Sequence, residues 1–152
     1  MNSAPSDIVA KILIGASLAE IPGQGVVWPV YVGRLPADVD TGLQISDASP
    51  DSQEGFDMRS KERIIQHGVQ IIIRVDRASY GRGMVKTGKV QRHLETVHTQ
   101  TISIVDYDDS DTIRNYNIAH IQCPTGALYI GAGEDDERHH FSINAFLTAK
   151  EV

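Results

Sequence analysis

The chain has 152 residues and a formal net charge of −6, with 41% hydrophobic and 22% charged residues. These proportions are typical of a globular protein, and the length predicts a single domain over residues 1–152. The negative charge argues against a general nucleic-acid binder, which grips phosphates with lysine and arginine. The single cysteine, Cys123, excludes an internal disulfide framework and favours a reducing compartment.

An amphipathic helix is expected first, in residues 5–20. Ser6 is the expected N-cap, and Asp7 suits the positive end of a helix. Four apolar residues recur on one helical face: Ile8, Ile12, Leu13 and Ala16. The stretch has the pattern of neither a signal peptide nor a membrane span, so we expect a cytoplasmic protein.

An edge strand and a polar loop are expected next. Residues 26–33 (VVWPVYVG) are rich in strand formers, but Pro29 restricts them to an edge strand or an extended arm. Residues 43–46 (LQIS) alternate as a short strand. Residues 47–68 are dense in polar side chains, glycine and proline, which predicts an exposed loop over residues 48–66. Such a loop either contacts a partner or is merely solvated.

A strand followed by a second helix is expected in the middle of the chain. Apolar and polar residues alternate in the strand, with Val69, Ile71, Ile73 and Val75 on one face. Residues 78–98 then change to helical spacing, although their three glycines disfavour a helix. The predicted shared face of this helix consists of Tyr80, Met84, Gly88 and Leu94.

Four strands joined by short turns complete the chain. They are expected in residues 101–105, 113–123, 127–131 and 139–147. Because consecutive strands are segregated from the helices, the sequence predicts an α+β domain. Its expected form is a mainly antiparallel sheet with two helices packed on one face, plus an extended arm and a long polar loop.

Two adjacent histidines, His139 and His140, are the most conspicuous candidates for chemistry. Successive side chains in a strand point to opposite faces, so His139 is expected on the side of Phe141, and His140 on that of Ser142. Neighbours so placed cannot easily hold one ion, and no histidine or cysteine pair has metal-ligand spacing. The sequence therefore favours histidines at the end of a strand over a metal site.

The other candidate motifs also lack a necessary part. The glycines in residues 131–136 lead into acids and a strand, whereas a phosphate loop requires a helix N-terminus. The acidic residues 106–111 lack the central glycine and terminal glutamate of a calcium loop. Cys123 lies beside a proline, without a nucleophile motif. The cations in residues 80–89 could touch phosphate or form a solvated helix face. We therefore expect no enzyme activity, no cofactor, and no catalytic or metal-binding residues.

Two stretches nevertheless resemble one protein family. The strand GVQIIIRVDRASY enters the second helix, and the strand YIGAGEDDERHHFSINAFL closes the domain. Together they resemble the tail terminator (tail completion, or minor capsid) proteins of long-tailed bacteriophages. The matching residues are Gln70, Ile71, Arg74, Tyr80, Gly131, Asp136, Glu137, Arg138, Phe141, Ser142, Ile143 and Asn144. The chain departs from the family pattern in its polar insert, its helix glycines and its histidine pair.

The resemblance implies a structural protein of the virion neck, assembled in the host cytoplasm. Such proteins form a hexameric ring that caps the tail tube, stops its elongation and provides the head-tail joining surface. The implied partners are the tail tube protein and a head-side connector or stopper protein. DNA passes through the central channel without specific binding, and no membrane is involved. Six chains would carry about −36 charges, and an anionic lumen would repel DNA.

Ring contacts require two different complementary surfaces on each chain. We expect the arm and the polar loop to supply them, because an edge strand can join a neighbour's sheet. The expected subunit-interface residues are Trp28, Val30, Tyr31, Val32, Phe56, Met58 and Arg59. The expected channel-lining acids are Asp106, Asp108, Asp109 and Asp111.

Two alternatives remain open at this stage. One is another head-tail connector, stopper or tail tube subunit. The other is a small metal-dependent enzyme or ligand-binding domain.

Overall fold

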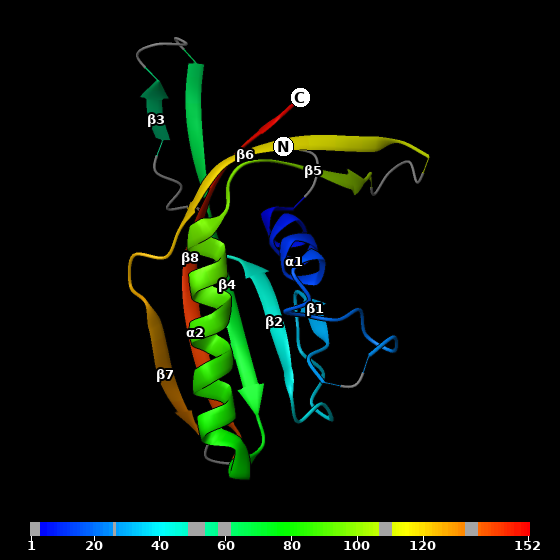
Figure 1. Cartoon of the computed structure of the whole chain (residues 1–152), viewed down its shortest axis with the longest axis vertical. Coiled ribbons are helices and arrows are strands. Elements are labelled where there is room, and N and C mark those ends of the chain that lie inside the picture. The colour runs from blue at the N-terminus through cyan, green and yellow to red at the C-terminus, as the bar shows by residue number, and fades with distance from the viewer. Residues whose placement is uncertain (1–3, 26, 49–53, 58–61, 107–110, 133–136) are drawn as a thin grey trace.

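The fold was analysed in a computed structural model, which describes residues 4–25, 27–48, 54–57, 62–106, 111–132 and 137–152 (Figure 1). Two helices and eight strands form, together with a short 3-10 helix before the second helix. In chain order they are α1 (Pro5–Gly15), β1 (Val30–Val32), β2 (Gly42–Asp47), β3 (Glu54–Asp57), β4 (Glu62–Val75), the 3-10 helix (Arg77–Ser79), α2 (Tyr80–Thr96), β5 (His98–Val105), β6 (Ile113–Gln122), β7 (Ala127–Ala132) and β8 (His139–Glu151).

One curled sheet organises the domain, with the strand order β1-β2-β4-β8-β6-β5. β3 pairs with β4, and β7 pairs with β8. β8 is central, because β4 covers one of its edges while β7 and β6 share the other. Among the described strands, only β1 and β2 pair in parallel. The sheet bends into a half-barrel (Figure 1), so the α+β prediction with a mainly antiparallel sheet is confirmed.

The hydrophobic core lies between one face of the sheet and both helices. The alternating residues of the two central strands are at most 3% exposed: Val69, Ile71, Ile73, Val75, Phe141, Ile143, Ala145 and Leu147. Ile8 and Leu13 of α1 belong to the same buried cluster as Val90 and Leu94 of α2. The predicted packing of two helices on one sheet face is therefore confirmed.

The start of α1 differs from the sequence prediction. The N-cap is Ala4 rather than Ser6, because Pro5 occupies the first helical position, where its missing N–H is not needed. Ser6 is buried inside the first turn. Its backbone N–H and its hydroxyl donate hydrogen bonds to the carboxylate of Asp47, at 2.8 and 3.2 Å. The end of β2 thus supplies the acceptor that a capping side chain would give. The helix ends before Ala16, which was expected on its apolar face.

The buried stripe of α2 also differs from the prediction. Met84 and Tyr80, both expected in the core, are 59% and 40% exposed. The buried positions are Gly83, Lys86, Thr87, Val90 and Leu94. Gly83 lies so close to the sheet that a Cβ atom there would be 2.5 Å from the ring of Phe141. Because the helix touches the sheet at this glycine, the neighbouring Met84 points outward.

The prediction of a loop over residues 48–66 is wrong for the part of this range that the structure describes. β3 pairs antiparallel with the first residues of β4, from Glu54 opposite Ile65 to Asp57 opposite Glu62. Figure 1 shows this hairpin extending beyond the rest of the sheet. A two-stranded extension depends on backbone pairing more than on a buried face, so the sequence carries no clear hydrophobic signal for it.

The expected edge strand is confirmed as β1, which pairs in parallel with β2 at one end of the sheet. Its outer side is partly covered. The N–H of Val30 donates to the carbonyl of Glu20, and the N–H of Glu20 donates to the carbonyl of Trp28, both at 2.9 Å. Neither helix in the described part of the chain is long and apolar enough to span a membrane.

Candidate functional site

His139 lies at the start of β8 and is held by two hydrogen bonds. Its Nε2 atom is 3.0 Å from the carbonyl oxygen of Arg77, and its Nδ1 atom is 3.0 Å from the hydroxyl of Tyr129. Because a carbonyl can only accept, Nε2 carries a proton and donates it to this bond, while Nδ1 pairs with the tyrosine hydroxyl. Both ring nitrogens are thus occupied by the protein itself. A metal ion could bind only by displacing one of these partners.

Aromatic rings surround His139 and join α2 and β7 to β8. The ring of Tyr80 lies 5.2 Å from that of Tyr129, 5.3 Å from that of His139 and 5.4 Å from that of Phe141. The first two pairs are edge-to-face, a favourable geometry for aromatic side chains. This aromatic cluster fixes the first turn of α2 against the sheet, so His139 has a structural setting.

His140 lies on the opposite face, as strand alternation predicted. Its Nε2 atom accepts a hydrogen bond from Nε of Arg74 at 3.2 Å, which requires that nitrogen to be unprotonated. The same arginine donates to the carbonyls of Pro36 and Val39 at 2.9 and 3.1 Å. Arg138 donates to the carbonyl of Ala37 at 2.7 Å. Arg74 of β4 and Arg138, which immediately precedes β8, therefore hold the connector between β1 and β2 against the sheet.

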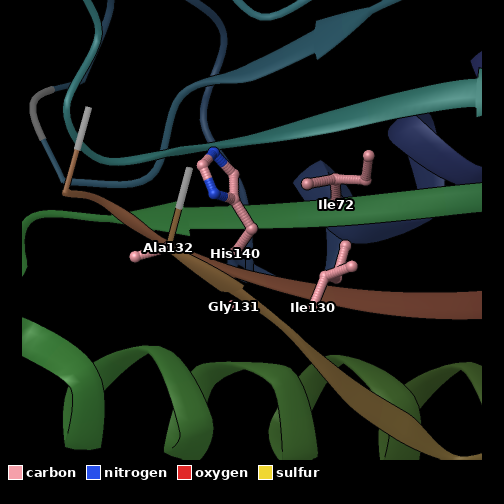
Figure 2. Close-up of a pocket in the computed structure, with 5 residues that line it drawn as sticks. All are labelled: Ile72, Ile130, Gly131, Ala132 and His140. Atoms are coloured by element: carbon pink, nitrogen blue, oxygen red, sulfur yellow. The ribbon is translucent and has the colours of Figure 1, made fainter. Parts of the chain in front are cut away.

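A shallow hollow of about 280 Å³ lies beside His140 on this outer face (Figure 2). Its other lining residues are Ile72 from β4 and Ile130, Gly131 and Ala132 from β7. Ile130 is displaced by an irregularity in the pairing of β7 with β8 and is 57% exposed. The imidazole of His140 is the one polar side chain among these residues. The hollow therefore resembles an apolar contact surface more than an enclosed reaction site.

The described residues include neither a cluster of potential metal ligands nor a reactive cysteine. No three His, Cys, Asp or Glu side chains within them lie close enough to hold a metal ion. The thiol of Cys123 is 6% exposed, and burial together with the negative charge of Glu95 raises its pKa to about 11. A thiol with so high a pKa is a weak nucleophile at neutral pH. Burial also lowers the pKa of His67.

The residues expected at a subunit interface occupy different environments. Val30 is 5% exposed and belongs to the core, so it is not available to a partner, and that expectation is wrong. Trp28 is half-buried beneath two cations of α2. Tyr31 is half-buried and Val32 is 44% exposed at the edge of the sheet. The backbone of Phe56 lies in β3, whereas Met58 and Arg59 fall outside the described residues.

The acids expected to line a channel also occupy different environments. Asp106 is 7% exposed, and its carboxylate accepts a hydrogen bond from Nε of Arg114. Arg114 also donates to Glu151 at 2.7 Å, and these two bonds raise the pKa of the arginine. The buried carboxylate of Asp106 is therefore paired with an arginine, which argues against a channel role. Asp111 is exposed.

The remaining two, Asp108 and Asp109, fall outside the described residues.

Two exposed apolar surfaces were missed by the sequence analysis. Val105 and Ile113 pair with each other at the far end of the β5–β6 hairpin and are 52% and 63% exposed. Leu128 and Ile130 of β7 are 48% and 57% exposed. In the described sheet, β5 and β7 each have one paired edge and one open edge. Apolar side chains on open edge strands are typical of surfaces that another chain covers.

Comparison with known proteins adds no identification. No protein-family model matches the chain, and no curated protein matches its sequence.

Proposed function

We propose that this protein is a tail terminator of a long-tailed bacteriophage. In this role six copies form a ring that caps the tail tube, stops its elongation and provides the head-tail joining surface. DNA passes through the central channel. The observation that carries the proposal is that the two stretches behind the family resemblance form one structural unit at the centre of the sheet.

The matching residues of the two stretches pair directly. Gln70 lies opposite Asn144 and Ile71 lies opposite Ile143 in the β4–β8 register. Nε2 of Gln70 also donates to the hydroxyl of Ser142 at 3.4 Å. Residues far apart in the sequence thus combine into one strand pair, as expected if the resemblance reflects a common structural core. Local strand alternation alone would not require the two stretches to meet.

The exposed surfaces are compatible with a ring. A closed ring of identical chains needs two different surfaces that fit each other. We assign this role to the β5–β6 hairpin and the β7 edge, because each combines an open strand edge with exposed apolar side chains. Pairing of one with the other would add strands across the subunit boundary. Tyr31, Val32 and the β3–β4 hairpin remain proposed contacts, and Val30 is removed from the set.

The proposed channel keeps its acidic character without Asp106. Asp108, Asp109 and Asp111 remain the proposed lining residues, in the part of the sequence between β5 and β6. Carboxylates around a channel would repel the DNA backbone and prevent it from binding to the wall.

The alternatives gain no support from a specific observation. Another connector, stopper or tube subunit would use similar surfaces, and it differs in its level within the particle. A metal-dependent enzyme or ligand-binding domain would need free ligands, whereas His139 and His140 are bonded to neighbouring groups.

Electron microscopy and light scattering of the purified protein, alone and with tail tubes, test the proposal. We expect six-fold rings in solution or at tube ends. In Ile113→Asp, burial of the new charge at a subunit boundary should abolish assembly. Val85→Asp is the matched control, because Val85 is 58% exposed on α2, and it should assemble normally. A strict monomer that also ignores tube ends would refute the proposal. Cryo-microscopy of the particle distinguishes a terminator from a connector by its level in the neck.

A further inference from the structure

Three cations form a stripe along α2. Arg82, Lys86 and Lys89 recur at intervals of four and three residues, which places them on one side of a helix. Arg82 and Lys89 are exposed, but Lys86 is only 8% exposed. Lysine is rarely buried to this degree unless an opposite charge accompanies it. The stripe therefore differs from an ordinary solvated helix face.

Trp28 forms the floor beneath this stripe. The guanidinium carbon of Arg82 lies 5.1 Å from the centre of the indole ring, and Nζ of Lys86 lies 4.9 Å from it. Both distances allow cation–π attraction, which holds the two cations in place. An indole ring has no net charge, however, so it leaves the positive charges unneutralised.

The stripe forms no ion pair within the described part of the chain. None of the three cations forms an ion pair with a described residue. Burial lowers the pKa of Lys86 to about 8, repulsion from Lys89 and Arg82 lowers it as well, and Glu20 partly offsets them. The carboxylate of Glu20 also accepts a hydrogen bond from the N–H of Val27 at 3.2 Å, and it offsets only part of the positive charge of the stripe.

We infer that Arg82, Lys86, Lys89 and Trp28 form a binding site for phosphate groups. Arginine presents a planar set of donors that matches phosphate oxygens, and lysine adds compact positive charge. From Arg82 to Lys89 the helix rises about 10 Å, at about 1.5 Å per residue. A row of this length suits successive phosphates of a nucleic-acid strand, and a single oxyanion would occupy only part of it. The site is built within one chain, so it does not depend on ring formation.

Trp28 provides the assay, because it is the only tryptophan in the sequence. Its fluorescence can be followed while the full-length protein is titrated with inorganic phosphate or with a short DNA duplex, at pH 7 and low salt. We expect a saturable change in emission. Lys86→Met keeps most of the packing against Trp28 but removes the charge, and should weaken binding at least about tenfold. Lys11→Met is the control, because Lys11 is exposed on α1, and it should bind like the wild type.

The two titrations identify the source of the phosphate. Tighter binding of the duplex, weakened steeply by salt, assigns the site to nucleic acid. Binding of inorganic phosphate alone assigns it to a free oxyanion, and either result supports the inference. If Lys86→Met does not fold, Arg82→Met serves instead, because it changes an exposed side chain. The inference is overturned if neither titration gives a saturable change, or if the site variant and Lys11→Met respond alike. None of these binding results would change the outcome of the microscopy and light-scattering test for rings.

Discussion

Gly83 is predicted to be essential for the packing of α2, although glycine is normally unfavourable within a helix. A Cβ atom at this position would lie 2.5 Å from Cε2 of Phe141 and 2.8 Å from Cγ2 of Val75. Both groups are buried in the core, so neither can move freely aside. Gly88 in the same helix is the matched control, because a Cβ atom there would meet nothing within 4 Å.

The magnitudes follow from two opposing effects. Replacing a helical glycine with alanine stabilises a protein by about 0.4–1 kcal/mol when there is space for the methyl group. Overpacking a core costs roughly 1–3 kcal/mol. Gly83→Ala should therefore lower the free energy of unfolding by about 1–2 kcal/mol. Gly88→Ala should raise it by about 0.4–1 kcal/mol.

Urea denaturation followed by circular dichroism measures both variants against the wild type. Gly88→Ala should be the most stable of the three proteins and Gly83→Ala the least stable. In thermal unfolding, each kcal/mol would correspond to about 2–4 °C in Tm. If Gly83→Ala were as stable as Gly88→Ala, the close contact between α2 and the sheet would be refuted as the reason for the glycine.

Three further predictions concern buried ionisable groups. The pKa of Lys86 is lowered to about 8, so the folded chain loses this proton at a lower pH than the unfolded chain does. The free energy of unfolding should therefore rise with pH above 8 until the lysine of the unfolded chain also loses its proton, and urea denaturation of Lys86→Met should show no such rise. Arg114→Met should lower Tm at neutral pH, because it removes the cation bonded to the buried carboxylate of Asp106; an unchanged melting curve would contradict this role. The pKa of Cys123 is raised to about 11, so its reaction with a disulfide reagent at pH 8 should be about a hundredfold slower than in urea. Equal rates would show that the thiol is not buried.

The sequence predicted those parts of the fold that apolar spacing encodes. The alternation through Phe141 and Ile143 identified the core face of β8, and that through Ile71 did the same for β4. The buried stripe of α2 could not be predicted in this way. It contains a glycine, a lysine and Thr87, whose hydroxyl donates to the carbonyl of Gly83 at 2.7 Å. Hydrophobic periodicity does not register such residues, so Met84 was assigned to the wrong side.

The environment of the candidate site was predictable only in part. Strand alternation placed His139 and His140 on opposite faces, and this was confirmed by their contacts. Two of their partners, Arg77 and Arg74, could not be inferred, because they lie more than sixty residues earlier. Burial of Lys86 over Trp28 likewise depends on a tertiary contact between the arm and α2. One sequence contains no local signal for such a contact.

The central position of β8 also sets the order in which a newly synthesised chain can complete its sheet. β8 leaves the ribosome after the strands that it joins. The hydrogen bond from Gln70 to Ser142 can therefore form only after 72 further residues have been synthesised. Until then β6 has only β5 beside it among the described strands, and β7 has no neighbour. Contacts so distant in sequence form slowly, and strand edges left open in the meantime can pair with another chain. The arrival of β8 closes this interval, because one strand then covers the open edges of β4, β6 and β7.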